Sequence, residues 1–164
     1  MGLIPEKAVH IGIPGKLQAQ ACEIIPESVG KKACGVEGFA GVGGNLTVMD
    51  VSFISIRLIL PVAAEIMGEE GRFLTLVKPQ FEAGKGQVGK NGVVREKETH
   101  ERVLKEICTF APSFGWHVAQ MTYSPIKGPA GNIEFLADIR PGEGEMLSDE
   151  YIKVLVDQAH KELK

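Results

Sequence analysis

Two short apolar segments, each closed by a charged residue, constrain this chain more than any other feature. Residues 46–49 (LTVM) end at Asp50, and residues 73–77 (FLTLV) end at Lys78. Runs this short and this apolar are typical of strands that are buried on both faces, as in parallel sheets covered by helices. The stretch between them, 58–67, is helical in character. A strand, a helix and a second strand in this order predict an α/β fold whose first strands are parallel.

The rest of the chain continues this pattern with one helix, two strands and a final helix. An amphipathic helix is expected at about 98–114, because its apolar residues recur at helical spacing. Alternation predicts strands at 116–123 and 133–139, and Ser148 is placed to cap the last helix. The order β-α-β-α-β-β-α with short connections indicates an α/β architecture.

Residues 1–45 differ from the rest in composition. They hold nine of the chain's 20 glycines and show no sustained period, which predicts loops with one short helix at 16–25. We therefore expect an atypical leader ahead of a domain at 46–164. The segment 35–44 (GVEGFAGVGG) has the glycine content of a dinucleotide-binding loop. It leads into a strand, however, whereas such a loop follows a strand and opens a helix, so we do not assign it to a cofactor.

Composition narrows the classes of function. Eighteen Lys and Arg against 21 Asp and Glu give a net charge of −3, which excludes attachment to nucleic acid by bulk charge but not by a local basic patch. The three cysteines (Cys22, Cys34 and Cys108) lack metal spacing and fit reduced thiols, and no zinc-ligand set is present. The longest uncharged stretch, 107–126, is broken by proline and glycine, and the N-terminus does not read as a signal peptide. We expect no membrane segment and a cytoplasmic location.

Three ionisable residues fall at or beside predicted strand ends. Asp50 and Lys78 close the first two strands, and Glu134 stands near the start of the strand at 133–139. Ligands of open α/β sheets bind outside the carboxyl ends of the parallel strands. If the strand after Glu134 runs antiparallel to the others, its start lies at the same edge, and an acid, an amine and a second acid meet there. The alternative is a set of ordinary solvated charges at strand termini.

The loop at 84–94 is a candidate nucleic-acid contact. Between 78 and 97 the chain carries five basic residues against two acids, and three of the cations, Lys85, Lys90 and Arg95, are candidates for RNA binding. Its glycines would let the backbone approach a phosphate closely. The alternative is a solvated mobile loop, and one aromatic residue gives little support for base stacking.

The remaining candidate side chains form no catalytic motif. His100 and His160 are expected on helix surfaces, and His117 lies in a strand. Cys108 adjoins the apolar face of its helix and is expected in the core, not as a nucleophile.

Four sequence strings together resemble those of the hemolysin A (TlyA) family of FtsJ-like, S-adenosylmethionine-dependent rRNA 2′-O-methyltransferases. They occur in the family's order and spacing, within about residues 46–140. They are 50–55 (DVSFIS), 77–84 (VKPQFEAG), 88–95 (VGKNGVVR) and 124–135 (SPIKGPAGNIEF).

The resemblance implies a Rossmann-like methyltransferase sheet, of which this chain would hold the fourth to seventh strands. The seventh would be antiparallel and inserted between the fifth and the sixth. It also implies that Asp50, Lys78 and Glu134 match the last three members of the family's Lys-Asp-Lys-Glu catalytic tetrad, and that Asp50 contacts the cofactor. S-adenosylmethionine as methyl donor and rRNA or ribosomal subunits as partner follow from the same resemblance.

Family members carry further parts ahead of the Asp50 motif. These include a glycine loop for the cofactor, a first catalytic lysine and usually an RNA-binding domain, and residues 1–45 show none of their motifs. We therefore expect a partial methyltransferase domain, or alternatively a non-catalytic RNA-binding or cytolysin-associated protein that retains the fold. A sheet beginning with the strand at 46–51 would leave an unpaired edge, which favours a homodimer formed through it.

Overall fold

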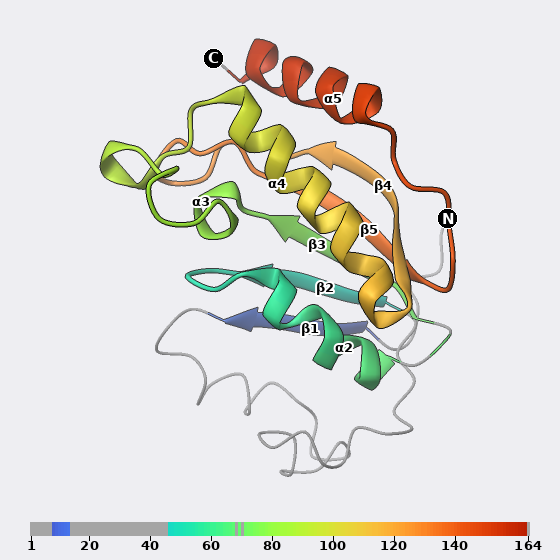
Figure 1. Cartoon of the computed structure of the whole chain (residues 1–164). Coiled ribbons are helices and arrows are strands. Elements are labelled where there is room, and N and C mark those ends of the chain that lie inside the picture. The colour runs from blue at the N-terminus through green and yellow to red at the C-terminus, as the bar shows by residue number, and fades with distance from the viewer. Residues whose placement is uncertain (1–7, 14–45, 68, 70, 164) are drawn as a thin grey trace, which may run out of the picture.

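The computed structural model describes residues 8–13, 46–67, 69 and 71–163, and of residues 8–13 it describes the backbone. Five strands form one sheet in the order β1-β2-β3-β5-β4 (Figure 1). The strands are Ala8–Ile13 (β1), Leu46–Val51 (β2), Phe73–Val77 (β3), Trp116–Tyr123 (β4) and Phe135–Pro141 (β5). The predicted helix at 16–25 and the glycine-rich segment 35–44 lie outside the described residues.

Helices α2 and α4 lie in front of the sheet in the view of Figure 1, and α5 packs against α4 and β4. The helices are Leu60–Met67 (α2), Pro79–Glu82 (α3), Lys97–Phe110 (α4) and Asp149–Glu162 (α5). Short 3₁₀ turns cover Ile56–Leu58, Lys90–Gly92 and Ala111–Phe114. As predicted, the Ser148 hydroxyl caps α5 by accepting from the backbone of Tyr151. None of the described helices is long and apolar enough to cross a lipid bilayer.

The direction of the strands brings several of their ends to one edge. β1, β2 and β3 are parallel, whereas β5 runs antiparallel to both of its neighbours, β3 and β4. The insertion of an antiparallel strand between β3 and β4 confirms the topology that the resemblance implies. The carboxyl ends of β1, β2, β3 and β4 and the amino end of β5 therefore share one edge, which we call the rim.

The prediction of an unpaired edge on β2 is wrong. β1 pairs in parallel with the whole of β2, from Ala8 opposite Leu46 to Ile13 opposite Val51. The segment at 8–13 (AVHIGI) is short and lies in glycine-rich surroundings, so its periodicity is too weak to predict a strand. Because β1 occupies that edge of β2, the argument for a homodimer formed through it no longer stands.

The core is formed by residues that the sequence periodicity selects. In β3, Phe73, Thr75 and Val77 are buried and the two leucines between them are half-buried, and β5 shows the same alternation. Cys108 is buried as predicted, and burial raises the pKa of its thiol to about 11, which makes it a poor nucleophile.

A buried histidine pair joins α4 to α5. His100 was expected on a helix surface, but it is fully buried, with its ring edge-on to Phe135. Its Nδ1 lies 2.8 Å from Nε2 of the half-buried His160. Burial, followed by the charge of His160, lowers the pKa of His100 to about 4. An ion pair between Lys97 and Asp157 joins the same two helices beside this pair.

We expect the free energy of unfolding to decrease when the pH is lowered from 7 to 5. Since the pKa of His100 is about 4 in the folded chain and 6.5 ordinarily, the unfolded chain binds a proton below pH 6.5 that the folded chain does not. At pH 5 the titration of His100 alone lowers the free energy of unfolding by about 2 kcal/mol relative to neutral pH. Urea unfolding at pH 7 and at pH 5 measures the decrease in the free energy of unfolding. In His100→Leu this decrease should be smaller by about 2 kcal/mol. Equal losses in the two proteins would contradict the assignment.

Candidate active site

The three predicted site residues all lie at the rim. Asp50 is next to last in β2, Lys78 directly follows β3, and Glu134 directly precedes β5. Val77 pairs with Phe135 in the antiparallel ladder, so the residues that come next on each strand, Lys78 and Glu134, are neighbours at that edge. The folded sheet thus brings together an acid, an amine and a second acid that are up to 84 positions apart in the sequence.

The ammonium group of Lys78 is held in place by two acceptors from the end of β2. Its Nζ lies 2.6 Å from the Asp50 carboxylate and donates to the Ser52 hydroxyl at 3.0 Å. The Lys78 side chain is 13% exposed, whereas that of Asp50 is 49% exposed. Because an ammonium has three N–H donors and no other acceptor for it occurs among the described residues, one donor is available to a ligand.

The carboxylate of Glu134 is buried and is confined on two sides by Gln80 and Gly128. Gln80 on α3 donates to Oε1 at 3.0 Å, and only 8% of the residue is exposed. On the other side lies Gly128, where an added Cβ would stand 2.6 Å from the same oxygen, so a side chain there would displace the carboxylate. In the described part of the chain Glu134 makes no ion pair with Lys78.

An aromatic pair at the rim is a feature that the sequence analysis missed. Phe53 follows Ser52 directly, is 81% exposed, and lies with its ring centroid 5.0 Å from that of Phe81. Its φ of 66° places it in the left-handed region, which is unusual for a bulky residue. Backbone strain of this kind costs about 1–3 kcal/mol and is concentrated at functional sites. An exposed, strained aromatic that directly follows Ser52, the hydrogen-bond partner of Lys78, suits the stacking of a base.

The basic loop lies at the same end of the molecule. Lys85, Lys90 and Arg95 are all exposed, and none of them forms an ion pair with another described residue. The loop is attached to the start of β5 by the buried Asn132, which accepts from the backbone N–H of Val94 at 3.0 Å and donates to a carbonyl of the loop at 2.9 Å. These two hydrogen bonds fix the backbone of the second half of the loop, and the side chains of its cations stay exposed to solvent.

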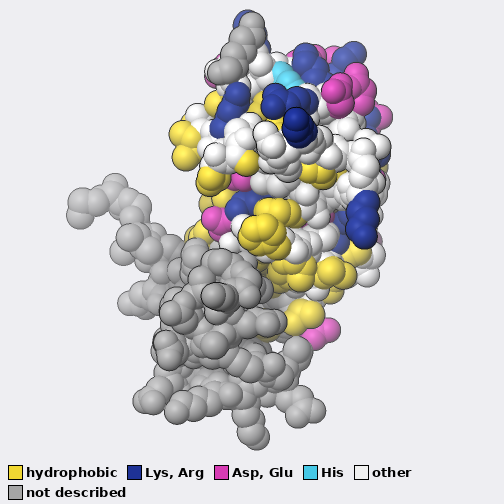
Figure 2. All heavy atoms as spheres, turned by 90° about the vertical axis from the view of Figure 1, so that its left-hand side faces the viewer, with side chains coloured by type: hydrophobic (Ala, Val, Ile, Leu, Met, Phe, Trp, Pro, Cys, Tyr) yellow, Lys and Arg dark blue, Asp and Glu magenta, His cyan; other side chains and the backbone are white. Residues whose placement is uncertain are grey.

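Figure 2 faces this end of the molecule and shows the surface that a ligand would meet. Lys and Arg side chains lie above and beside a group of hydrophobic side chains, and acidic side chains are visible mainly at the upper right of this face. The mixture of cations and apolar surface on one face suits a ligand that has both phosphates and flat bases.

Comparison with known proteins agrees with these motifs. A model of the FtsJ-like methyltransferase family matches residues 18–140, so the match begins inside the segment expected to be a leader. The chain is 47% identical over 124 residues to "Putative rRNA methyltransferase YqxC" of Bacillus subtilis. It is 38% identical over 122 residues to "16S/23S rRNA (cytidine-2'-O)-methyltransferase TlyA" of Mycobacterium tuberculosis. Each alignment covers 73% of this chain and 44% of the relative, so the chain spans less than half of their length.

A solved structure shares the fold. "Putative hemolysin from Streptococcus thermophilus" superposes with a TM-score of 0.68 at 47% identity, over 73% of this chain and 43% of that one. "Hemolysin A" of Brachyspira hyodysenteriae, at 41% identity over 93 residues, covers 57% of this chain and 39% of its own length. The sheet topology, the residues at the rim and these matches agree, and the chain belongs to the FtsJ-like methyltransferase family.

Proposed function

We propose that the rim of this chain methylates the 2′-hydroxyl of a ribose in rRNA, with S-adenosylmethionine as the methyl donor. The observation that carries the proposal is the convergence of the Asp50–Lys78 ion pair and the buried Glu134 carboxylate on one sheet edge. The similarity to TlyA, which is named as a cytidine-2′-O-methyltransferase, supports a cytidine as the target. Ribosomal subunits as substrate imply action in the cytoplasm.

The rim offers one group that fits the cofactor. The half-exposed carboxylate of Asp50 would accept hydrogen bonds from the amino group of S-adenosylmethionine while its other contacts hold Lys78. When bound, the cofactor supplies an electrophilic methyl group on a positively charged sulfur.

The residues of this chain would act on the ribose hydroxyl. The free N–H of Lys78 donates to the 2′-oxygen, fixing it in position and stabilising the negative charge that develops there. The Glu134 carboxylate accepts the hydrogen bond of the hydroxyl and takes its proton as the new O–C bond forms and the S–C bond breaks. Gln80 and Gly128 keep that carboxylate in one position during the step.

The surroundings of the rim suit an RNA substrate. The exposed ring of Phe53 can stack on a base that has left its strand, close to the ammonium that binds the sugar. Lys85, Lys90 and Arg95 can pair with backbone phosphates, which fixes the register of the RNA without reading its sequence.

A transfer assay tests the function. The full chain is incubated with ribosomal subunits and S-adenosylmethionine carrying a labelled methyl group, and the rRNA is digested to nucleosides. We expect label in a 2′-O-methylated cytidine. Binding of rRNA without any transfer of label would overturn the enzyme reading and favour the non-catalytic RNA-binding alternative. Label on a base instead of a ribose would show that the chemistry is assigned to the wrong acceptor.

A further inference from the structure

Glu82 is a buried acid that has no part in the chemistry proposed above. It is the last residue of α3, the short helix that follows Lys78, and its side chain is 2% exposed. A carboxyl group removed from water is costly unless hydrogen bonds and charges satisfy it. The partners of Glu82 therefore indicate what the fold gains by keeping it there.

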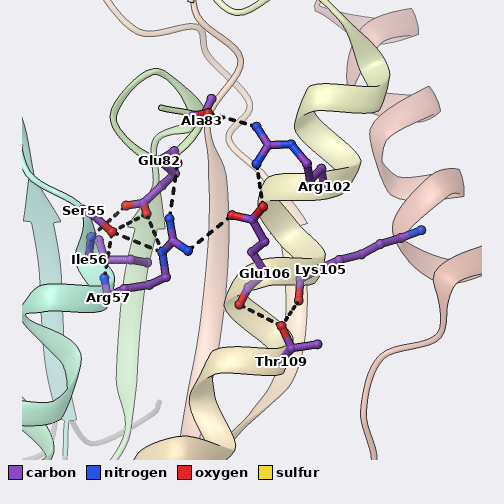
Figure 3. Close-up of polar contacts among 9 residues, drawn as sticks. All are labelled: Ser55, Ile56, Arg57, Glu82, Ala83, Arg102, Lys105, Glu106 and Thr109. Carbon is purple, nitrogen blue, oxygen red and sulfur yellow. Dashed lines mark hydrogen bonds and ion pairs between the residues drawn. The ribbon is translucent and has the colours of Figure 1, made fainter. Parts of the chain in front are cut away.

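All the side-chain partners of Glu82 come from the segment that follows β2 (Figure 3). Its Oε1 accepts from the backbone N–H of Ile56 at 2.7 Å, and its Oε2 accepts from the Ser55 hydroxyl at 2.6 Å. The Arg57 guanidinium lies 3.4 Å from Oε2. The carboxylate thus caps the 3₁₀ turn at Ile56–Leu58, although Glu82 lies 26 positions after Ile56 in the sequence.

Further ion pairs connect Arg57, and with it the Glu82 carboxylate, to α4. Arg57 also donates to the backbone carbonyl of Glu82 and pairs with Glu106 at 3.3 Å. Glu106 pairs in turn with Arg102, which donates to the carbonyl of Ala83 at 3.0 Å (Figure 3). The segment after β2, α3 and α4 are therefore joined by one network of charges, in which Glu82 is the buried carboxyl group.

The position of this contact matters for the rim. The segment 52–56 leaves the buried end of β2 at Val51 and is next fixed at Ile56 by Glu82. Between these two points lie Ser52, which holds Lys78, and the strained Phe53. Without the second point, the segment keeps the ring contact of Phe53 with Phe81 and the hydrogen bond of Ser52 to Lys78, but it loses the contacts that hold its far end against α3 while Phe53 is strained.

We propose that Glu82 is a positioning residue, which holds the segment 52–56 against α3 and thereby sets Ser52 and Phe53 in place over Lys78. The expected effect of Glu82 on catalysis rests on the proposed function. The claim that Glu82 holds the segment 52–56 against α3 does not depend on that function. Glu82 itself touches neither the ribose nor the cofactor in this account.

The test compares Glu82→Ala with the conservative Glu82→Gln in the full chain. The alanine removes every side-chain contact of Glu82, whereas the glutamine keeps an acceptor for Ile56 and a partner for Ser55. We expect Glu82→Ala to lower kcat about 100-fold, since small displacements of reacting groups cost about that much. The KM for S-adenosylmethionine should change little, and Glu82→Gln should recover most of kcat. Amide hydrogen exchange across 52–58 should accelerate in the alanine variant only.

Met67→Ala is the matched control. Met67 is equally buried, but it contacts Thr47 at the opposite end of β2 from the rim. It should lower the melting temperature while leaving kcat per folded molecule and exchange at 52–58 near the wild-type values. If Glu82→Ala does not fold, Ser55→Ala replaces it, because that change removes one of the same contacts from a partly buried side chain, and its loss of kcat should be several-fold.

The possible outcomes separate this proposal from the function itself. Wild-type kcat and exchange in Glu82→Ala, or in Ser55→Ala where that variant replaces it, would overturn the positioning role. A loss of kcat in Met67→Ala as large as in Glu82→Ala would overturn it too. If the wild-type chain transfers no methyl group, the proposed function fails, and hydrogen exchange alone decides on Glu82. Faster exchange at 52–58 in the alanine variant, but not in the glutamine variant or in Met67→Ala, would then support it.

Discussion

Lys78→Ala is expected to lower methyl transfer to rRNA by a factor of about 10³, because it removes the one cation placed at the ribose oxygen. The fold should survive the change, since the partner carboxylate of Asp50 is half-exposed and can be solvated once the ammonium is gone. Single-turnover transfer of the labelled methyl group measures the rate, and thermal unfolding checks the fold.

Lys97→Ala is the matched control for this experiment. Lys97 is also paired with an aspartate, but its partner, Asp157, lies on α5, away from Lys78. The control should transfer at close to the wild-type rate, and a wild-type rate in Lys78→Ala would show that the ammonium has no role in the reaction. Lys78→Arg should retain more transfer than Lys78→Ala, because a guanidinium stays protonated and can still donate a hydrogen bond to the ribose oxygen.

Converting Lys85, Lys90 and Arg95 together to Ala should flatten the salt dependence of rRNA binding. Each cation that contacts a phosphate releases counterions, so three contacts correspond to roughly two to three units in the slope of log affinity against log salt. The three side chains are exposed and free of ion pairs among the described residues, so their removal should cost little stability. Lys78→Ala should weaken binding less, because that residue is placed at the sugar.

A second triple variant controls for the change in net charge. Lys105, Lys153 and Lys161 lie on α4 and α5, and their conversion to Ala removes the same charge from another surface. Binding of rRNA fragments at several salt concentrations should give the wild-type slope for this control. A wild-type slope in the loop variant would mean that the loop is only a solvated connection.

The strands that bear the rim could be predicted closely because their ends are marked in the sequence. The predicted bounds of β3 and β4 match the structure, since Lys78-Pro79 and Gly115 interrupt the apolar pattern. The closeness of Lys78 and Glu134 could not follow from spacing alone. It depends on the antiparallel register that pairs Val77 with Phe135. Only the family resemblance indicated that the strand after Glu134 is antiparallel.

Other parts of the site carried a weaker signal or none. His100 lies three and four positions before the buried Val103 and Leu104, so its burial could have been read from the helical stripe. α3 is a four-residue helix that opens with Pro79, too short for any periodicity to reveal. The left-handed backbone of Phe53 has no signature in the sequence, because bulky residues rarely adopt that conformation.

β5 lies between β3 and β4 in the sheet, and this position determines when Asp50, Lys78 and Glu134 can come together during synthesis of the chain. β4 is synthesised before β5, yet in the part of the chain that the structure describes β4 pairs with β5 alone. The sheet therefore stays divided until Pro141 has emerged. Glu134 directly precedes β5, so Lys78 gains its second acidic neighbour in the same folding event that makes the sheet continuous. A nascent chain therefore cannot acquire the chemistry proposed for the rim before β5 has joined β4 to the rest of the sheet.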